Sequence, residues 1–319
     1  MSEQQLTILL SARHDEGLAE RIRQIAPAAR IVSGQDLDSD DAVIADVEVA
    51  YGGIKPELFA RARRLRWLQT TGAGVAWAQR PDVRDHAVVI TNAHIHGDQI
   101  AEHLFGLLLM LNHRLHEAWL MQRDGQWKSP PTVRQIATLS GRRLCVLGLG
   151  VIGQRCAMLG SAHGMNVVGL RRHPRPHEHC QAVYGPDQLA EALTGAEVVM
   201  NLLPGTSGTA KLIGRGQFEL LADGALFFNA GRGSTVDTDA MVDALRGGKL
   251  AGAGLDVVDP EPLPPGHPLW TLPNVLITPH YSGAVADYQA RAERVFLANL
   301  ERYLAGRPLQ GVVDKQAGY

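Results

Sequence analysis

The sequence predicts an α/β protein built from two doubly wound parallel-sheet domains. Short apolar runs alternate with helix-like segments over roughly the first hundred residues, as expected for a parallel sheet covered by helices. A long helical pattern and a polar loop interrupt this alternation, which begins again at Arg143 with a glycine-rich turn after its first strand. With 319 residues, the chain is long enough for two domains.

The first part of the chain supplies the first sheet. The apolar runs that read as strands are residues 6–10, 42–51, 65–70 and 87–92. Residues 15–27 and 56–64 have helical patterns, and a longer helical pattern follows over residues 98–123. The polar, proline-containing segment 125–142 predicts an ordered loop.

The second part of the chain has six strand-like runs, which is the number of strands in a doubly wound dinucleotide-binding domain. They are residues 144–150, 166–170, 196–204, 224–233, 250–257 and 274–280. An amphipathic helix over residues 284–304 follows the last of them, and we expect it to pack on the first domain.

Composition excludes several classes of function. The net charge of −2 gives no general attraction to nucleic acid or membranes. The N-terminus does not resemble a signal peptide, and the longest apolar stretch, residues 104–111, is too short to span a bilayer. Three cysteines without framework spacing predict reduced thiols in a cytoplasmic protein.

The turn after the first strand of the second part has the pattern Gly148-x-Gly150-x-x-Gly153. Gly148 would allow the tight turn, Gly150 the close approach of a pyrophosphate, and Gly153 the packing of helix on strand. The helix that follows would direct free N–H groups and the positive end of its dipole at the anion. The pattern predicts dinucleotide binding, with an ordinary structural turn as the alternative.

A basic segment follows the next strand, where NAD-binding proteins often place an acidic residue. Arg171 occupies that place, followed by Arg172 and Arg175. Because guanidinium groups bind phosphate in a fork, the segment predicts a 2′-phosphate contact and a preference for NADP. A solvated basic loop is one alternative. A metal site is another, but no metal is expected because the candidate ligands lack paired spacing. These candidates are His173, His177, His179 and Cys180.

Four residues near strand ends have the side chains that reduction of a 2-oxo acid requires: Arg232, Asp256, Glu261 and His280. An imidazole can donate and accept the proton near neutral pH, and a neighbouring carboxylate favours its charged form. A guanidinium can bind the substrate carboxylate. Taken singly, Arg232 could equally form a structural ion pair, Glu261 could be a solvated loop acid, and His280 could be a core histidine.

These segments together resemble the D-2-hydroxyacid dehydrogenase family. The similarity covers nearly the whole chain. It includes residues 69–75, 91–103, 147–153, 201–209, 228–237, 253–270 and 272–280. The resemblance implies that Arg232 binds the carboxylate and polarises the carbonyl, His280 transfers the proton, and Glu261 orients and charges His280.

The resemblance also implies the binding residues. The cofactor would contact Gly148, Gly150, Val151, Ile152, Gly153, Arg171, Arg172, Pro204, Thr209, Ala230, Arg232, Asp256 and His280, with Asp256 holding the nicotinamide carboxamide. The substrate would contact Arg232, His280 and the loop of Ala73, Gly74 and Val75, whose backbone N–H groups would meet its carboxylate. Tyr51, Gly52 and Tyr281 are expected to face the pocket.

The implied layout is discontinuous. A Rossmann cofactor domain over residues 99–284 would be inserted in a flavodoxin-like substrate domain made of residues 1–98 and 285–319. Family members usually dimerise through the cofactor domain, so a homodimer is expected. The helical segment 98–121 is a candidate dimer arm and equally a candidate core helix.

The chain departs from the family at three places. Arg171 and Arg172 replace the acidic NAD signature, as in NADP-preferring glyoxylate and hydroxypyruvate reductases. Tyr281 follows His280 where smaller aliphatic residues are common. The chain stops at Tyr319 without a regulatory domain, which argues against a phosphoglycerate dehydrogenase of the serine-feedback type.

The predicted activity is NADP-preferring reduction of a 2-oxo acid to a D-2-hydroxy acid, on a substrate like glyoxylate or hydroxypyruvate, with NAD also possible. One alternative is a nucleotide-sensing binding protein similar to the corepressors of this fold. Another is a dehydrogenase of a different small anion, such as formate or phosphite.

Overall fold

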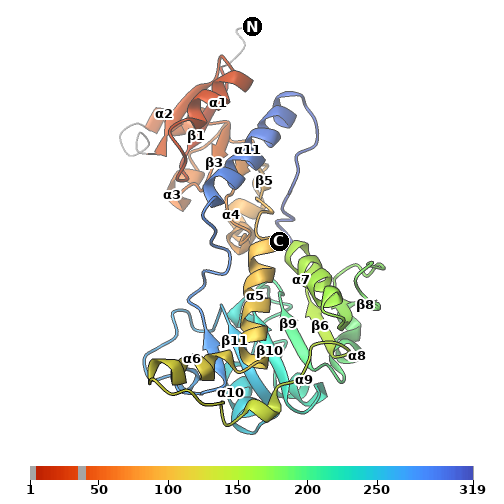
Figure 1. The fold of residues 1–319 in the computed structure, drawn as a ribbon. Coiled ribbons are helices and arrows are strands. Elements are labelled where there is room, and N and C mark those ends of the chain that lie inside the picture. Colours follow the sequence, from red (N-terminus) through yellow and green to blue (C-terminus); the bar gives the residue numbers. More distant parts are fainter. Residues whose placement is uncertain (1–4, 35–40, 319) are drawn as a thin grey trace. The chain divides into compact units, whose positions relative to one another are not determined.

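The computed structural model describes residues 5–34 and 41–318 and divides into two compact units (Figure 1). Unit 1 comprises Met1–Ile95 and Val285–Tyr319, and unit 2 comprises His96–Ala284. Within the described residues, no helix combines the length and apolar character needed to cross a membrane.

Unit 1 contains a parallel sheet of five strands in the order β2-β1-β3-β4-β5. Its strands are β1 (Thr7–Leu10), β2 (Arg30–Ser33), β3 (Val49–Tyr51), β4 (Trp67–Gln69) and β5 (Val89–Thr91). Its helices are α1 (Leu18–Ile25), α2 (Asp41–Asp46), α3 (Pro56–Phe59), η2 (Ala76–Gln79), α4 (Pro81–Arg84) and α11 (Tyr288–Leu304).

Two of these elements differ from the sequence prediction. The predicted strand over residues 42–51 is wrong in its first half, which forms α2. Val43, Ile44 and Val47 are all buried there, a spacing that puts them on one face of a helical turn. Strand β2 has no counterpart in the prediction, because its four residues include only two large apolar side chains.

The C-terminal segment belongs to the core of unit 1. Phe296 of α11 lies 4.7 Å from the Tyr51 ring and 5.3 Å from the Trp67 ring, measured between centroids. The buried Asn299 donates to Gln69 Oε1 at 3.0 Å and is also hydrogen-bonded to the backbone of Gln310. Residues 285–319 therefore complete the fold that the N-terminal residues begin.

Unit 2 contains a parallel sheet of seven strands in the order β12-β11-β10-β9-β6-β7-β8. Its strands are β6 (Arg143–Leu147), β7 (Asn166–Leu170), β8 (Ala182–Tyr184), β9 (Val198–Asn201), β10 (Ala225–Asn229), β11 (Leu250–Leu255) and β12 (Val275–Ile277). The six predicted strands are all present. The prediction missed β8, whose three residues form the half-buried edge of the sheet.

Helices cover both faces of this sheet, so its inner strands are buried on both sides. The helices of unit 2 are α5 (Gly97–Asn112), α6 (Leu115–Arg123), η3 (Val133–Gln135), α7 (Val151–Ala162), η4 (Pro186–Gln188), α8 (Leu189–Leu193), α9 (Arg215–Leu220), η5 (Gly233–Thr235), α10 (Thr238–Arg246) and η6 (Pro268–Trp270). Residues of α5 and α7 pack in one core cluster, and residues of α8, α9 and α10 pack in the other.

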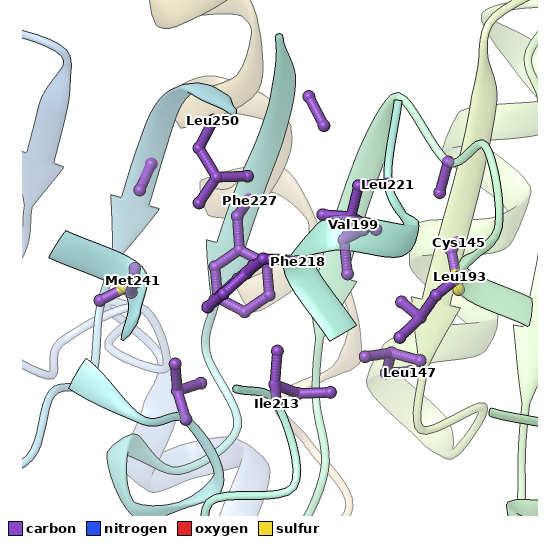
Figure 2. Packing of buried hydrophobic residues seen from close by; sticks show 14 of the residues in the cluster. Cys145, Leu147, Leu193, Val199, Ile213, Phe218, Leu221, Phe227, Met241 and Leu250 are labelled. Atoms are coloured by element: carbon purple, nitrogen blue, oxygen red, sulfur yellow. The ribbon is translucent and has the colours of Figure 1, made fainter. Parts of the chain in front are cut away.

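Alternate residues of β6 show how the strands serve both clusters. Cys145 and Leu147 point into the cluster of Figure 2, where Phe218 packs edge-on against Phe227 with ring centroids 5.4 Å apart. Leu144 and Val146 point into the opposite cluster, beside α5. This period of two is the geometry of a β-strand.

The long helix predicted over residues 98–123 is two helices in the structure. The chain turns at Arg114, which has φ of +55° between α5 and α6. Most of the apolar side chains of α5 are buried in unit 2, so α5 is a core helix. The apolar surface of the segment lies instead on α6, where Leu115, Trp119 and Leu120 are each 52% exposed.

Candidate active site

The glycine turn lies between β6 and α7, and steric contacts explain two of its glycines. Gly148 has φ of +98°, and a Cβ there would lie 2.8 Å from the Leu202 carbonyl oxygen. A Cβ on Gly153 would lie 2.2 Å from the Gly148 carbonyl oxygen. A Cβ on Gly150 would meet no protein atom within 4 Å, so open space lies over the start of α7. The turn thus combines close helix–strand packing with an open outer face.

The basic segment begins beside this turn. The last residue of β7, Leu170, accepts hydrogen bonds from the backbone N–H groups of Gly148 and Leu149, at 3.0 and 2.9 Å. Arg171 is the next residue and is half-buried, whereas Arg172 and Arg175 are exposed. The structure therefore places the start of the basic segment next to the glycine turn.

The histidines and cysteines show no metal-binding arrangement. His177 Nδ1 lies 4.0 Å from Cys180 Sγ, and no group of three or more potential ligands in residues 5–34 and 41–318 could hold a metal ion. All three cysteines are free thiols. Burial raises the pKa of Cys145 and Cys156 to about 12 and that of Cys180 to about 11, so these thiols stay protonated at neutral pH.

Pro204 and Thr209, two of the predicted cofactor contacts, lie in a loop that the Thr209 side chain organises. Its hydroxyl donates to the Pro204 carbonyl at 2.6 Å and accepts from the Thr206 N–H at 2.9 Å. A Cβ on Gly205 of this loop would lie 3.1 Å from Arg232 Cγ. The loop after β9 therefore packs against the segment that carries Arg232. Ala230, just after β10, is buried, whereas Val151 is exposed and Ile152 half-buried at the start of α7.

Arg232 is held by hydrogen bonds of its own carbonyl and by one from its Nη1 to the Gly231 carbonyl at 2.6 Å. Its carbonyl accepts from Asn229 Nδ2 at 3.2 Å and from Thr235 Oγ1 at 2.6 Å. Its two glycine neighbours are required, since a Cβ on Gly231 or Gly233 would lie 2.6 or 1.9 Å from a backbone oxygen. Within the part of the chain that the structure describes, no ion pair reaches the half-buried guanidinium. A structural ion pair therefore does not explain Arg232.

The buried carboxylate of Asp256 organises the loop that follows β12. It accepts from Thr278 Oγ1 at 2.7 Å, from the Tyr281 N–H at 3.1 Å, and from both the hydroxyl and N–H of Ser282. All four donors belong to the loop that follows β12, so the Asp256 carboxylate fixes the conformation of that loop. The Asp256 carbonyl also accepts from the His280 N–H at 2.9 Å. The carboxamide contact expected of Asp256 stays a prediction.

Glu261 and His280, from two different loops of unit 2, are hydrogen-bonded to each other. His280 Nδ1 lies 2.8 Å from Glu261 Oε1, and the two side chains are 50% and 40% exposed. Because the carboxylate accepts, Nδ1 carries the proton of this hydrogen bond, and Nε2 remains available for a reacting group. His280 has φ of +52°, a left-handed backbone conformation that is uncommon for a residue with a side chain.

The predicted carboxylate loop lies in unit 1, after β4. Ala73 and Gly74 are exposed, but the Val75 side chain is buried, so only the backbone of Val75 could meet a ligand. Tyr288 Oη donates to the Thr71 carbonyl at 2.9 Å and ties the loop to α11. The expectation that the Tyr51 side chain faces a pocket is wrong, because it is fully buried against Phe296.

Gly52 and Tyr281 were also expected at the pocket. Gly52 lies against the chain after β1, since a Cβ on it would lie 2.4 Å from the Ala12 nitrogen. Tyr281 is 50% exposed, and its ring meets the His103 ring edge-on with centroids 5.5 Å apart.

Sequence reasoning missed the polar residues that hold these loops. Asn201 Nδ2 donates to Asn229 Oδ1 at 3.1 Å and to Thr235 Oγ1 at 2.8 Å, which links the ends of β9 and β10. His103, on α5, lies 2.9 Å from Thr278 Oγ1. The available signal was a polar residue inside a buried apolar segment: Asn201 and Asn229 each end a fully apolar strand, and His103 lies within the apolar face of α5.

Comparison with known proteins decides the family. Residues 105–282, more than half of the chain, match the model of the family described as "D-isomer specific 2-hydroxyacid dehydrogenase, NAD binding domain". The chain belongs to this family. It is therefore an enzyme of the D-2-hydroxyacid dehydrogenase type, and the matched residues lie within unit 2. The family resemblance and the two parallel-sheet domains expected from the sequence are confirmed.

Similar dehydrogenases include one curated protein and two solved structures. The chain is 36% identical to glyoxylate/hydroxypyruvate reductase A of Serratia proteamaculans over 221 residues, which cover 69% of each chain. A D-isomer specific 2-hydroxyacid dehydrogenase of Xanthobacter autotrophicus, solved with NADPH and MES, has a TM-score of 0.83 and 30% identity, over 99% of this chain and 100% of that one. The NADPH-dependent glyoxylate/hydroxypyruvate reductase of Sinorhizobium meliloti, solved with NADP and sulfate, has a TM-score of 0.83 and 26% identity, over the same shares.

Proposed function

We propose that this dehydrogenase reduces a small 2-oxo acid, such as glyoxylate or hydroxypyruvate, to the D-2-hydroxy acid with a preference for NADPH. The observation that carries the proposal is the 2.8 Å contact between His280 Nδ1 and Glu261 Oε1, which leaves Nε2 free. The names of the similar proteins from Serratia and Sinorhizobium support the substrate class.

In this proposal, His280 donates a proton from Nε2 to the substrate oxygen as charge develops on it. Glu261 stabilises the imidazolium and fixes the orientation of the ring. Arg232, which has no ion pair in the described residues, binds the substrate carboxylate and polarises the carbonyl. Residues 73–75 of unit 1 are proposed as substrate contacts through their backbone N–H groups.

The residues of unit 2 fit a bound dinucleotide. Gly150 leaves open space where the pyrophosphate would lie over the start of α7, and the Gly153 contact keeps that helix close to β6. The chemistry that a bound nicotinamide would supply is the hydride that reduces the 2-oxo acid. Val151, Ile152, Pro204, Thr209, Ala230 and Asp256 are the other proposed contacts.

The cofactor preference is proposed from the basic segment. Arg171 follows the strand that is hydrogen-bonded to the glycine turn, where the ribose of a bound dinucleotide would lie. A guanidinium there can donate to a 2′-phosphate but cannot accept from a 2′-hydroxyl. Arg171 and Arg172 would therefore favour NADP over NAD.

We also propose that the protein is a cytoplasmic homodimer. Leu115, Trp119 and Leu120 on α6, and Trp127 after it, are exposed apolar side chains, and we propose that a second copy covers those on α6. Helix α6 belongs to unit 2, the unit that matches the NAD binding domain. Light scattering after size-exclusion chromatography measures the mass; a monomer at micromolar concentration would contradict the dimer.

The catalytic assignment is tested by oxidation of NADPH and NADH with glyoxylate, hydroxypyruvate, pyruvate and bulkier 2-oxo acids. His280→Ala should lower kcat about 10²- to 10⁴-fold, the usual contribution of general acid–base catalysis. Its affinity for NADPH should stay close to that of the wild type. Unchanged turnover would refute the role of His280. Absence of turnover with every 2-oxo acid despite tight NADPH binding would favour the nucleotide-sensing alternative.

The cofactor assignment is tested by the double change Arg171→Ala and Arg172→Ala. Loss of charge-assisted hydrogen bonds of about 1.5–3 kcal/mol should weaken NADPH binding roughly 10- to 150-fold while leaving NADH within about 3-fold. Arg215→Ala, an exposed arginine paired with Asp243, is the matched control and should change neither. Equal weakening of NADPH and NADH would contradict a 2′-phosphate contact.

A further inference from the structure

His103 lies on α5, far in the sequence from the residues assigned to catalysis. Its side chain is 17% exposed, and its ring points at the loop that follows β12. His103 Nε2 lies 2.9 Å from Thr278 Oγ1, across a sequence separation of 175 residues. The ring of Tyr281, from the same loop, packs edge-on against it. The His103 imidazole therefore contacts two residues of the loop that carries His280.

The hydrogen bonds determine which atom holds the proton. Thr278 has one hydroxyl proton, and its oxygen lies 2.7 Å from Asp256 Oδ1, an atom that also accepts from the Tyr281 N–H. The Thr278 proton is therefore donated to Asp256, and Thr278 Oγ1 must accept from His103. His103 Nε2 consequently carries a proton. The three residues form a directed chain from His103 through Thr278 to Asp256.

The same three residues also bring the His103 N–H close to the buried Asp256 carboxylate. The Asp256 side chain is 1% exposed, and His103 Nε2 lies 3.9 Å from its Oδ1. Among the residues that the structure describes, no other basic side chain lies within 4.0 Å of this carboxylate. The positive end of the His103 Nε2–H bond dipole offsets part of the cost of burying the Asp256 carboxylate.

Asp256 and Thr278 in turn hold the backbone of His280. The His280 N–H is shared between the carbonyls of Asp256 and Thr278, both at 2.9 Å. His280 has φ of +52°, a conformation that is unfavourable for a residue with a side chain and persists only where the surroundings impose it. Loosening Asp256 or Thr278 would let His280 leave this conformation.

We propose that His103 is a positioning residue for this dehydrogenase: its Nε2–H donates to Thr278, orders the Asp256 carboxylate and so keeps His280 aligned for proton transfer. This inference rests on the proposed role of His280. His103 itself contacts neither substrate nor cofactor in the proposal. Its effect should therefore appear in the chemical step more than in the binding of either.

Three variants test the proposal. His103→Ala removes the donor, and His103→Gln keeps an N–H donor at nearly the position of Nε2. His163→Ala is the control, since His163 also packs against α5, stacked on Phe105 at 5.5 Å, away from the loop. The measurements are kcat and KM for glyoxylate, the dissociation constant of NADPH, the melting temperature, and the isotope effect with NADPH deuterated at the transferred position.

His103→Ala should lower kcat about 10-fold, the equivalent of one lost hydrogen bond of roughly 1.4 kcal/mol in alignment of the reacting groups. The isotope effect on kcat should rise because the chemical step becomes slower, and NADPH affinity should stay within about 3-fold. His103→Gln should recover kcat to within about 3-fold of the wild type. His163→Ala should leave kcat within about 2-fold.

The proposal is overturned if His103→Ala leaves kcat and the isotope effect unchanged, or if activity falls only with the folded fraction and glutamine does not restore it. A measurement independent of turnover is the ¹H–¹⁵N spectrum of the histidine rings, with the His103 signal identified by its loss in His103→Gln. The Nε2–H form supports the proposal, and an Nδ1–H form refutes it. If no 2-oxo acid is reduced, the proposed function fails, yet this spectrum still decides whether His103 donates to Thr278.

Discussion

Replacing Gly153 by alanine tests the steric logic of the glycine turn. Gly153 lies in α7, and a Cβ there would lie 2.2 Å from the Gly148 carbonyl oxygen and 3.0 Å from its carbon. Real Cβ atoms essentially never approach closer than 3.0 Å. The atom in the way is backbone of the same turn, so no side-chain rotation relieves the contact. The helix must move away from β6, or the turn must change.

The expected loss follows from two opposing effects. Overpacking of this kind costs typically about 1–3 kcal/mol, and a rigid backbone contact belongs at the upper end of that range. Alanine recovers about 1 kcal/mol of helix propensity over glycine. The net destabilisation should therefore be about 2 kcal/mol. For a unit of 150–250 residues, this lowers the melting temperature by roughly 4–8 °C.

Two other helical glycines provide the comparison. A Cβ on Gly160, also in α7, would lie 2.5 Å from Leu144 Cδ2, the end of a side chain that can rotate, so Gly160→Ala should cost less. Gly216 in α9 has open space at the Cβ position, so Gly216→Ala should be neutral or raise the melting temperature by about 1–2 °C. Scanning calorimetry measures the melting temperatures of the three variants, which should rise from Gly153→Ala through Gly160→Ala to Gly216→Ala. A melting temperature of Gly153→Ala within 1 °C of the wild type would refute the steric argument.

Two further predictions concern unit 1. Tyr288→Phe removes the hydrogen bond to the Thr71 carbonyl and should raise the KM for a 2-oxo acid about 3- to 10-fold with little change in kcat. The control is Tyr303→Phe, on the same helix as Tyr288, which loses a hydrogen bond to Glu48 and should leave KM unchanged. Equal effects of the two changes on KM would contradict a role of Tyr288 in holding the loop. Burial, and secondarily Lys315, lower the pKa of His86, whose Nδ1 accepts from the Val88 N–H at 3.0 Å. The unfolded chain therefore binds more protons, and the free energy of unfolding should fall as the pH drops below about 6.5. His86→Asn, which keeps an acceptor that does not titrate, should weaken this dependence in denaturant titrations at pH 7.5 and 5.5, and an unchanged dependence would rule out His86 as its source.

The parts of the fold that the sequence predicted are those specified by local patterns. Each inner strand of unit 2 is a continuous apolar run because both faces of the sheet are covered, and all six predicted runs form strands. Strands β2 and β8 escaped prediction because they are short edge strands with few buried side chains. The strand prediction for the run that forms α2 was wrong because so few residues show too little periodicity to distinguish a helix from a strand.

The sequence by itself determined the residue types of the candidate site and their positions after strands. Strand ends of a parallel sheet share one edge, so a glycine turn, an arginine, an acid and a histidine that follow such strands can be expected together. The tertiary structure decided what holds them: the contact of Glu261 with His280, the four donors on Asp256, and the hydrogen bond from His103 to Thr278. These contacts join residues 19 to 175 positions apart, and they depend on strand order, register and loop conformation. No local pattern encodes those properties, because each is fixed only when the whole sheet has assembled.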